Sequence, residues 1–485
     1  ILLTAARHAG RYALMTRSAG PQIRGGESAA MVRFAEQPVR CIGDSFAVLA
    51  ALDWHAHGRF SDELPLAGGA LVLSDPDADP VPEIIQRNEP RILKIAFGAI
   101  AAAHADGRAN MVAVGAVGAA VALPLEALLA GVEEALADRG ERIIEAARRC
   151  IFAGYTALDR GPEPAAGYPP STKAPSVKRW NISGNEAAGL GALRGGIRFV
   201  AAYPITPASE MLEWLAPRLE WLGGDLLQAE DELAAINMII GSAFGGVPSL
   251  TATSGPGLSL MMEGLGLAVA SETPVVVVDV MRGGPSTGIP TKSEQSDLDL
   301  ALYGMHGDAP HLVLAPLDIA DCAFTLEWAT RLAERLQTAA IVLSDQSLGQ
   351  ARAIIDPPDR HDADRLGQGT AACCQPGVDG YRRYALTPNG ISPRALPGEP
   401  DCAYTADGLE HDSRGTPSSM AVDHLTQIDK RLRKLAQFDY GDSWGKIEGP
   451  EPDNADLCLI TWGSSSGAVR EAGGRLRAQH PVSYT

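Results

Sequence analysis

Acidic residues stand directly in front of an apolar stretch near the middle of the chain. Glu230, Asp231 and Glu232 come first, and the residues that follow are almost wholly apolar. Acids are common in the first turn of a helix, because they satisfy free N–H groups and complement the helix dipole. A buried carboxyl group at this place could instead hold a proton for chemistry. Both interpretations are open for Glu232.

A glycine-rich loop follows the same predicted helix. Glu232 is separated by a run of small and apolar residues from Gly241, where glycine permits a close backbone approach. The next predicted strand ends in Thr253-Ser254-Gly255-Pro256-Gly257. In an open parallel sheet, the carboxyl ends of the strands and the loops after them line the ligand crevice. We therefore expect a carboxylate and a glycine-rich loop at one edge of a sheet.

Two prolines surround a threonine in the segment Tyr203-Pro204-Ile205-Thr206-Pro207. Proline fixes the φ angle of the backbone and is favoured in the first turn of a helix. The segment lies between a predicted strand and a predicted helix, so it would hold Thr206 rigidly at the strand's carboxyl end. The alternative is a tight turn without a chemical role.

A single arginine follows the most hydrophobic predicted strand. Arg282 comes directly after residues 274–281 and precedes Gly283-Gly284-Pro285. A buried guanidinium group is costly unless it meets an anion, and a carboxylate can accept two parallel hydrogen bonds from it. Arg282 is therefore a candidate for binding a substrate carboxylate, with Lys292 in the same loop. A structural salt bridge is the competing interpretation.

Strand and helix patterns alternate from about Ile182 to residue 345, and they predict the scaffold for these residues. The predicted strands are strongly apolar, as in sheets that helices cover on both faces, so we expect a doubly wound parallel sheet of the α/β class. The stretch from Gly184 to Gly196 is spaced unlike a GxGxxG nucleotide loop, and close packing through its glycines is the better interpretation. Strands are predicted over residues 197–204, 225–228, 248–254, 274–281 and 339–345, and helices over 207–219, 231–244 and 256–271.

Composition divides the chain into four segments. Residues 1–158 predict a first α/β domain, and residues 159–181 are rich in Pro and Gly, which is typical of a linker. Residues 182–360 contain the alternating pattern. Residues 361–485 are irregular until about residue 450, and a strand, a tight turn and a helix are predicted after that. Both ends are expected to be truncated, because the first residues lack an initiator Met and the last ones resemble the start of a strand.

Charge and composition argue against several functional classes. The 485 residues carry a formal net charge of −18, which disfavours binding to nucleic acid or to an anionic membrane. No apolar run has transmembrane length, and the first residues lack the layout of a signal peptide. The seven cysteines show no zinc or iron–sulfur spacing and are expected to be reduced thiols. We predict a cytoplasmic protein without a metal site of its own.

The spacing of Glu232, Gly241 and TSGPG resembles the pyrimidine-binding domain of thiamine diphosphate enzymes. Longer motifs narrow the resemblance to the alpha subunit of 2-oxoacid:ferredoxin oxidoreductases, especially the 2-oxoglutarate type. Near the front, PQIRGGESAAMVRF (21–34) resembles the gamma domain that is often fused ahead of alpha in this family. The other motifs are AYPITPASE (202–210), RGGPSTGIPTKSEQSDL (282–298), YRRYALTPNGISPRALPG (381–398) and GLEHDSRG (408–415).

The resemblance implies three-layer αβα domains and a role for each candidate residue. Residues 1–158 would be a gamma-type, Rossmann-like domain, 182–360 the pyrimidine-binding domain, and 361–485 a long segment leading into a transketolase C-terminal-like domain. Glu232 would be catalytic by hydrogen-bonding N1′ of the aminopyrimidine, and Thr206 would lie beside the thiazolium carbon and the 2-oxoacid. The implied substrate-binding residues are Arg282, Thr291 and Thr206, and the implied cofactor-binding residues are Glu232, Pro204, Ile205, Ser254 and Gly255.

A partner subunit is implied by motifs that this sequence lacks. A thiamine diphosphate enzyme needs a Mg-binding GDG motif, and neither this motif nor a cysteine set for an iron–sulfur cluster occurs here. The resemblance therefore assigns Mg2+, most of thiamine diphosphate and a 4Fe–4S cluster to a beta subunit, in an (alpha–beta)2 heterotetramer. It also implies coenzyme A as co-substrate and ferredoxin as electron acceptor, in the oxidative decarboxylation of a 2-oxoacid such as 2-oxoglutarate to an acyl-CoA.

Three alternatives are open at this point. A pyruvate or branched-chain 2-oxoacid enzyme of the same family would carry the same motifs. A non-catalytic docking subunit would keep the fold and carry Glu232 and Arg282 without needing them. A self-contained acetolactate-synthase-like lyase shares TSGPG, although the missing GDG motif counts against it.

Overall fold

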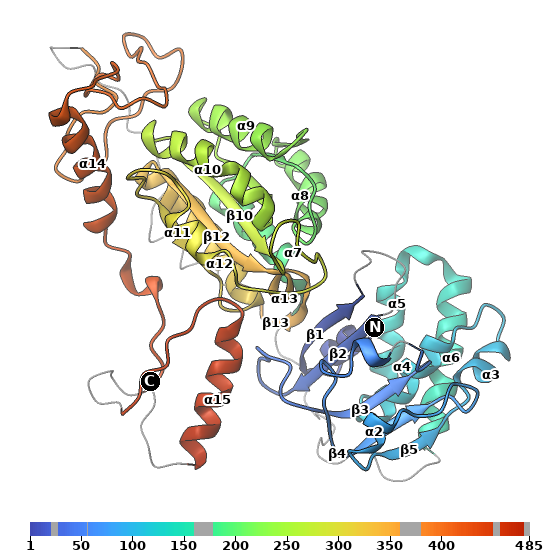
Figure 1. Cartoon of the computed structure of the whole chain (residues 1–485). Coiled ribbons are helices and arrows are strands. Elements are labelled where there is room, and N and C mark those ends of the chain that lie inside the picture. Colours follow the sequence, from blue (N-terminus) through green and yellow to red (C-terminus); the bar gives the residue numbers. More distant parts are fainter. Residues whose placement is uncertain (21–27, 56, 160–177, 359–379, 450–455, 480–485) are drawn as a thin grey trace. The chain divides into compact units, whose positions relative to one another are not determined.

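The computed structural model describes residues 1–20, 28–55, 57–159, 178–358, 380–449 and 456–479, and Figure 1 shows their elements. The chain divides into two units. Unit 1 consists of Ile1–Ile182 and Ala351–Pro357, and unit 2 consists of Ser183–Gln350 and Pro358–Thr485. Most of the predicted linker lies outside the described residues, and so do residues 21–27 at the start of the PQIRGGESAAMVRF motif.

The described part of unit 1 contains two small sheets. The order of the first is β2 (Ser28–Ala35), β1 (Tyr12–Ala19), β13 (Arg352–Ile355) and β6 (Trp180–Ser183), and β1 runs antiparallel to both β2 and β13. The second is parallel, with the order β3 (Phe46–Ala51), β4 (Leu66–Ser74) and β5 (Arg91–Lys94). The helices are α1 (Leu2–His8), α2 (Glu83–Gln86), α3 (Phe97–Ala102), α4 (Ala109–Ala120), α5 (Leu125–Ala135) and α6 (Glu141–Asp159), with short 3₁₀ turns at His57–Arg59 and Ala137–Arg139.

Helices α4 and α6 pack with their backbones in contact. A Cβ atom at Gly154 would overlap the carbonyl group of Val112, and one at Gly115 would overlap the carbonyl group of Ile151. Only glycine allows two helix backbones to come this close. The many small residues of this part of the sequence therefore serve packing between helices.

Unit 2 is built on a parallel sheet, and this confirms the doubly wound fold predicted for the region. All residues of its three central strands β9, β10 and β12 are buried, as expected for strands covered on both faces. The order of the described strands is β11 (Leu312–Leu314), β12 (Ala339–Asp345), β10 (Val275–Met281), β9 (Ser249–Thr253), β7 (Phe199–Ala202) and β8 (Asp225–Gln228).

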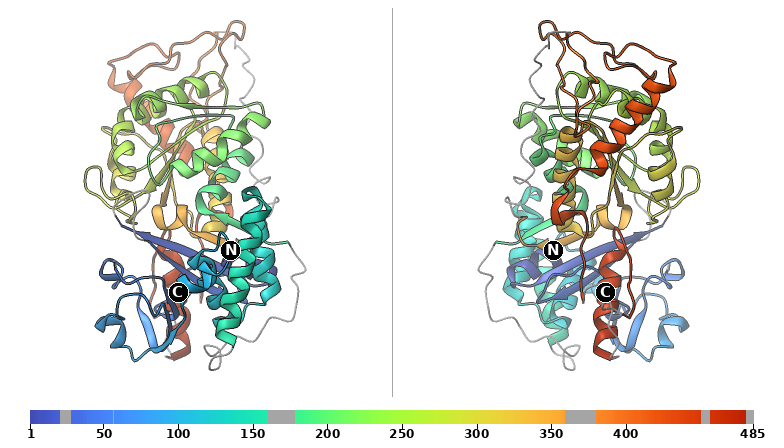
Figure 2. Two further views of the ribbon diagram at one scale, coloured as in Figure 1. Left: turned by 90° about the vertical axis from the view of Figure 1, so that its right-hand side faces the viewer. Right: turned by 90° about the vertical axis from the view of Figure 1, so that its left-hand side faces the viewer.

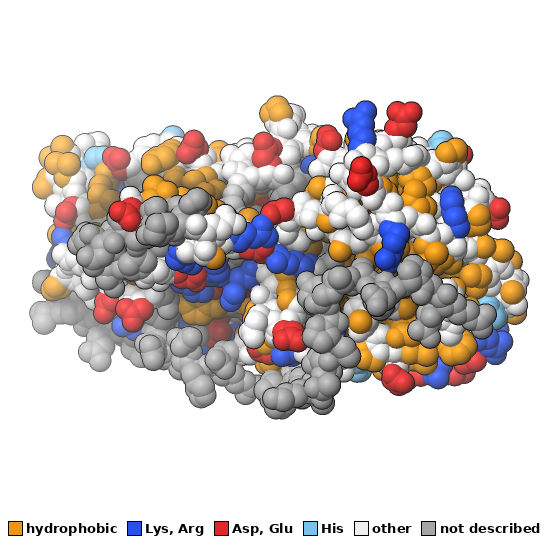
Figure 3. Space-filling view, turned by 90° about the horizontal axis from the view of Figure 1, so that it is seen from below, with side chains coloured by type: hydrophobic (Ala, Val, Ile, Leu, Met, Phe, Trp, Pro, Cys, Tyr) orange, Lys and Arg blue, Asp and Glu red, His pale blue; other side chains and the backbone are white. Residues whose placement is uncertain are grey.

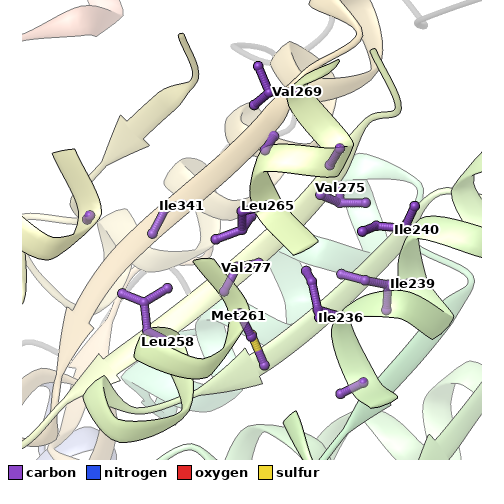
Figure 4. Packing of buried hydrophobic residues seen from close by; sticks show 14 of the residues in the cluster. Ile236, Ile239, Ile240, Leu258, Met261, Leu265, Val269, Val275, Val277 and Ile341 are labelled. Atoms are coloured by element: carbon purple, nitrogen blue, oxygen red, sulfur yellow. The ribbon is translucent and has the colours of Figure 1, made fainter. Parts of the chain in front are cut away.

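Helices cover both faces of this sheet. Helices α9 (Glu232–Phe244), α10 (Gly255–Ala270) and α11 (Leu298–Tyr303) lie on one face, and α7 (Gly184–Gly195), α8 (Ser209–Trp221) and α12 (Ile319–Leu336) on the other. Each large apolar side chain buried between them stabilises the fold by roughly 1.5–3 kcal/mol. Figure 4 shows the first face, where Ile236, Ile239 and Ile240 of α9 and Leu258, Met261 and Leu265 of α10 pack on Val275, Val277 and Ile341 of the sheet.

The end of unit 2 differs from the sequence prediction in two ways. Helix α14 (Ala421–Ala436) forms within the stretch that was expected to be irregular, and Figure 2 shows it beside the rest of the unit. The strand predicted before the last helix is wrong for residues 458–462, which form no strand and in which Ile460 is 93% exposed, while Leu457 forms only an isolated bridge. The remaining elements are α13 (Gln346–Gln350), a 3₁₀ turn at Gly441–Trp444 and α15 (Ser465–Gln479), the helix predicted last.

The surface of the described residues is mixed in character, and their cysteines are mostly free thiols. None of the described helices has the length and apolar character needed to cross a membrane. Acidic, basic and apolar side chains are interspersed over the face shown in Figure 3. Cys41, Cys150, Cys322 and Cys458 are free thiols, as expected, whereas Cys402 is disulfide-bonded, which corrects the expectation that all cysteines are reduced.

Candidate active site

The candidate residues lie at the carboxyl edge of the unit 2 sheet. The segment with Thr206 follows β7, the TSGPG loop follows β9, and Arg282 follows β10. Glu232 begins α9 after the turn that follows β8. Strands β8, β7, β9 and β10 are neighbours in the sheet, so their carboxyl ends form one continuous edge. The expectation that a carboxylate and a glycine-rich loop meet at one edge is confirmed.

Glu232 is a buried carboxylate without a hydrogen-bond donor among the described residues. It is the first residue of α9 and is 7% exposed. The N-cap of this helix is Asp231, whose carboxylate accepts a hydrogen bond from the backbone N–H of Ala234 at 2.7 Å. Helix capping is therefore assigned to Asp231 and does not explain Glu232. A buried carboxylate is costly unless a donor reaches it, so a donor supplied by a ligand fits this position.

The TSGPG loop provides the surface on which Glu232 lies. Thr253 ends β9, Ser254 is the buried N-cap of α10, and Gly255-Pro256-Gly257 form the start of that helix. A Cβ atom at Gly257 would lie 2.7 Å from both Oε1 and Cγ of Glu232. It would also overlap Oγ1 of Thr253, so any side chain at residue 257 would displace both the Thr253 hydroxyl and the carboxylate. The Oγ atom of Ser254 is buried and has no hydrogen-bond partner among the described residues.

The turn that carries Thr206 is anchored through its backbone. The peptide bond between Thr206 and Pro207 is cis. The Nδ2 atom of Asn185 donates to the carbonyl oxygen of Pro207 at 3.0 Å, and Nη1 of Arg282 donates to that of Thr206 at 2.6 Å. The hydroxyl group of Thr206 makes no hydrogen bond to the described residues. Thr206 and Ile205 are half-buried, and Pro204 is exposed.

Arg282 joins two segments of the edge and lies in the field of Glu232. Its side chain is 6% exposed, its Nε donates to the carbonyl oxygen of Thr287 at 2.9 Å, and its Nη2 donates to the same oxygen. It forms no salt bridge with a carboxylate of the described residues, so its hydrogen-bonded partners are carbonyl groups and not the expected acid. Burial lowers the pKa of Arg282, and the charge of Glu232 opposes this shift. Further N–H groups of the guanidinium are available to an anion.

The loop with Thr291 and Lys292 folds back on the residues that follow β10. The backbone N–H of Gly283 donates to the carbonyl oxygen of Lys292 at 2.9 Å, and that of Ile289 donates to Gly283 at 2.8 Å. Thr291 is half-buried next to this closure. Because Arg282 binds both Thr206 and Thr287, the loop and the Thr206 turn are held at the same part of the edge.

Three further polar residues support this edge, and sequence reasoning did not assign them a role. Asn185 lies in α7, whose glycines pack closely as predicted: Gly184 meets the backbone at Leu348. Asp345 ends β12 and accepts hydrogen bonds from Ser293, at 3.1 Å, and from Ser464. Asp279 lies fully buried within β10, where a charged residue among valines was the available signal.

Family models match two parts of the sequence. Residues 190–430 match the thiamine diphosphate-binding domain of pyruvate flavodoxin/ferredoxin oxidoreductases. Residues 1–157 match a second model, described as pyruvate ferredoxin/flavodoxin oxidoreductase. The first match contains every candidate residue named above except Asn185 and Ser464.

Individual relatives agree with the family models. The alpha subunit of 2-oxoacid:ferredoxin oxidoreductase 1 from Sulfurisphaera tokodaii is 40% identical over 317 residues, which are 62% of this chain and 49% of that subunit. The chain thus spans about half the length of that relative. The 2-oxoglutarate oxidoreductase subunit KorA of Mycobacterium tuberculosis is 33% identical over 488 residues, which are 93% of this chain and 72% of KorA.

A solved structure resembles the whole chain. It is a 2-oxoglutarate:ferredoxin oxidoreductase from Magnetococcus marinus with 2-oxoglutarate, coenzyme A and succinyl-CoA bound. The TM-score is 0.88 at 35% sequence identity, and the match covers 99% of this chain and 84% of the other.

Proposed function

The chain belongs to the alpha-subunit family of 2-oxoacid:ferredoxin oxidoreductases, and from this membership we propose that it forms part of an enzyme that oxidatively decarboxylates 2-oxoglutarate to an acyl-CoA. The observation that carries the proposal is the buried carboxylate of Glu232, which lies on Gly257 and lacks a hydrogen-bond donor among the described residues. A pyruvate or branched-chain 2-oxoacid is the alternative substrate. A panel of 2-oxoacids, assayed for kcat/KM, decides between them.

Glu232 fits the aminopyrimidine of thiamine diphosphate. The cofactor supplies, when bound, the carbon nucleophile that adds to the 2-oxo group and accepts the electrons left by CO2. Glu232 would hold a proton at the ring nitrogen N1′, and its buried carboxyl group, which none of the described residues binds, suits this role. Ser254 and Gly255 would face the same ring from the TSGPG loop, and the buried, unpartnered Oγ of Ser254 is consistent with a polar ligand there.

Thr206 and Arg282 would act on the 2-oxoacid. The unpaired hydroxyl of Thr206 would orient the substrate, with Pro204 and Ile205 lining the same turn beside the cofactor. Arg282 is buried and balanced by no salt bridge among the described residues, so its charge favours the substrate's carboxylate. Thr291 would contact that carboxylate from the loop held by Arg282. With these roles the chain would supply half of each active site, including one proton-holding group.

The metal and the electron carriers would come from elsewhere. The described residues contain no group of three or more His, Cys, Asp or Glu side chains placed to hold a metal ion. We assign Mg2+, the diphosphate and the 4Fe–4S cluster to a beta subunit. Ferredoxin would accept the electrons, and coenzyme A would accept the acyl group. Residues 1–158 would serve as the gamma-type domain, 182–360 as the pyrimidine-binding domain, and 361–485 as the segment leading to a transketolase C-terminal-like domain.

Substituting Glu232 by Gln tests the proposal in the assembled enzyme. The amide keeps the size of the side chain and cannot give up a proton at N1′, so kcat should fall by at least about a hundredfold. Exchange of the thiazolium C2 proton for deuterium, followed by NMR, should slow by a similar factor while the complex keeps its mass.

The neighbouring acid provides the matched control. Glu230→Gln changes an exposed carboxylate two residues away in the sequence and should leave kcat and C2 exchange unchanged. If Glu232→Gln retains full turnover, Glu232 has no part in the mechanism and the docking-subunit alternative gains support.

A further inference from the structure

A second buried carboxyl group lies on the strand that leads to Arg282. Asp279 is in β10, where every residue is buried, and its side chain is fully inaccessible. Side chains alternate along a strand, so Asp279 points to the same face as Val275, Val277 and Met281. These three side chains belong to the apolar cluster under α9 and α10. Asp279 therefore stands at the edge of a hydrophobic core, and the established motifs of the site do not include it.

The group opposite Asp279 is another acid. The carboxyl groups of Asp279 and Asp297 lie within hydrogen-bonding reach of each other. Neither oxygen of Asp279 finds a donor among the described residues, and Oδ2 of Asp297 is also buried without one. The other oxygen of Asp297 accepts a hydrogen bond from the hydroxyl group of Ser296 at 3.2 Å. Two carboxylates face each other here with no hydrogen atom between them unless one is protonated.

Among the described residues, no cation balances this pair. The charge acting on Asp279 is that of Asp297, and the charge acting on Asp297 is that of Glu294, another acid. Burial is the main cause that raises the pKa of both aspartates, and the neighbouring acids raise them further, whereas the hydrogen bond from Asp279 lowers the pKa of Asp297. Two adjacent carboxylates in a low-dielectric site cannot both ionise at moderate cost. The physical consequence is one proton held by two groups.

We propose that Asp279 and Asp297 share one proton at neutral pH, with Asp279 donating it to Asp297, and that this acid pair fixes the loop 282–297 to the first turn of α10. We assign the two residues a positioning role, because they act on the loop and on α10 and not on the reacting atoms. The effect on enzyme activity rests on the proposed function, whereas the shared proton does not.

The position of Asp297 explains what the pair holds in place. A Cβ atom at Gly255 would lie 2.5 Å from Oδ2 of Asp297 and 3.0 Å from its Cγ. Two residues further along α10, Gly257 makes the corresponding close contact with Glu232. The first turn of α10 thus lies against two carboxyl groups, one that we assign to the cofactor and one that ends the substrate loop.

The loop is then fixed at both ends. Arg282 begins it and binds the carbonyl oxygens of Thr206 and Thr287. Asp297 ends it, precedes α11, and is held by Asp279. Ionisation of both aspartates would place two buried negative charges at this junction and push Asp297 away from β10. Arg282 and Thr291 would then lose their fixed position relative to Glu232.

Infrared spectroscopy of the full-length chain in its complex tests for the shared proton. With 13C-labelled aspartate, the wild-type complex should show the carbonyl stretch of a buried protonated carboxyl group at pH 7, and the Asp279→Asn variant should lack it. Absence of the band from the wild type, or its persistence in Asp279→Asn, would overturn the proposal. This readout needs no enzyme activity, so it separates failure of the pair from failure of the proposed function.

Two substitutions at residue 279 separate the proton from the bulk of the side chain. Asp279→Asn still donates a hydrogen bond to Asp297, so the KM for the 2-oxoacid should stay within about twofold of wild type. Asp279→Leu keeps the branching at Cγ, with methyl groups that are larger than the oxygens, and removes the donor, so the KM should rise at least about tenfold with a smaller change in kcat. Equal effects of Asn and Leu would show that no proton is needed and would refute the positioning role.

The pH dependence of stability and of KM provides a further test of the shared proton. For an acid whose pKa is higher in the folded than in the unfolded state, stability falls as pH rises from the unfolded value of 3.8 toward the folded value. The wild-type complex should therefore lose thermal stability and raise its KM toward alkaline pH, and Asp279→Asn should lack this component. Identical pH profiles for the two proteins would count against the shared proton.

Discussion

Close contacts between carboxyl groups and glycines define this site at the scale of single residues. Glu232 lies on Gly257, and Asp297 lies on Gly255, so the two glycines of the TSGPG loop each make room for an acid. A side chain at either glycine would move a carboxylate whose place in the site depends on fractions of an ångström. The TSGPG loop therefore provides a surface against which two acids pack.

Replacing Gly257 by Ala should disable the site without unfolding the chain. The new methyl group would press on Glu232 and on the buried hydroxyl group of Thr253, and overpacking of this kind costs about 1–3 kcal/mol. Displacement of the carboxylate should lower kcat by about a hundredfold. Gly266→Ala is the control, because it lies in the same helix with no atom within 4 Å of the added Cβ and should raise stability by roughly 0.5–1 kcal/mol. Steady-state kinetics and thermal unfolding measure both; wild-type kcat in Gly257→Ala would contradict the assignment.

Arg282 supports a second prediction at this scale. Arg282→Ala removes both the charge and the bonds to Thr206 and Thr287, so the KM for the 2-oxoacid should rise by at least about a hundredfold. Arg282→Lys keeps the charge but lacks the planar fork of five N–H donors that bonds Thr206 and Thr287 at once, so an intermediate KM is expected. The KM for coenzyme A is the internal control and should change little. A rise in both KM values by the same factor would indicate a general collapse of the loop.

Helix α14 shows an unusual arrangement at the scale of elements. It buries Lys430 and Lys434, whose ammonium groups lie 2.5 and 2.9 Å from the carboxylate oxygens of Glu272. Nη2 of Arg383 donates to the backbone carbonyl oxygen of Glu272 at 2.8 Å. Glu272 is fully buried just after α10 and thus ties α14 to the sheet layer. Breaking a buried ion pair at one partner typically costs about 3–5 kcal/mol, because an unpaired charge is left behind.

Glu272→Gln should weaken the fold and change its response to acid. Burial opposes ionisation of Glu272, but Lys434 and Lys430 outweigh it and hold its pKa below the usual value of 4.5. A depressed folded-state pKa contributes stability above pH 4.5 that is lost as pH falls below it. The variant should therefore be about 3–5 kcal/mol less stable at pH 7 and lose less on acidification. Denaturant unfolding from pH 7 to pH 3 tests this; the exposed Glu220→Gln should behave as wild type.

The candidate site could be predicted from the sequence, whereas helix α14 could not. The site was predictable because Glu232, TSGPG and Arg282 interrupt regular apolar patterns at strand and helix ends, where chemistry collects. Helix α14 was missed because its buried face is polar: Gln427 and Lys434 point inward and Leu425 points outward. Hydrophobic periodicity assumes the reverse. Asp279 was visible as a charge in a buried strand, but its partner Asp297 lies beyond a loop, and only folding brings the two together.

Exposed apolar residues on α14 form a candidate contact surface of the molecule. Val422, Leu425 and Leu432 recur at helical spacing along one side and are 61%, 66% and 50% exposed. The opposite side is fixed by Glu272, so the helix cannot rotate to bury them. Apolar stripes of this kind mark protein–protein contacts. The stripe fits a chain that works within a complex, as the subunit designations of its relatives imply for them.

Charging the stripe should therefore impair assembly rather than folding. Leu425→Glu places a carboxylate in the middle of the stripe, and burying it against a partner would cost at least about 1.4 kcal/mol, a tenfold loss of affinity. The isolated chain should keep its stability within about 0.5 kcal/mol, since the residue is exposed. Gln437→Glu adds the same charge at the exposed end of α14, off the stripe. Sedimentation of the reconstituted complex should show dissociation for Leu425→Glu alone. If both variants assemble like wild type, the stripe faces solvent in the complex and some other surface of the chain carries the contact.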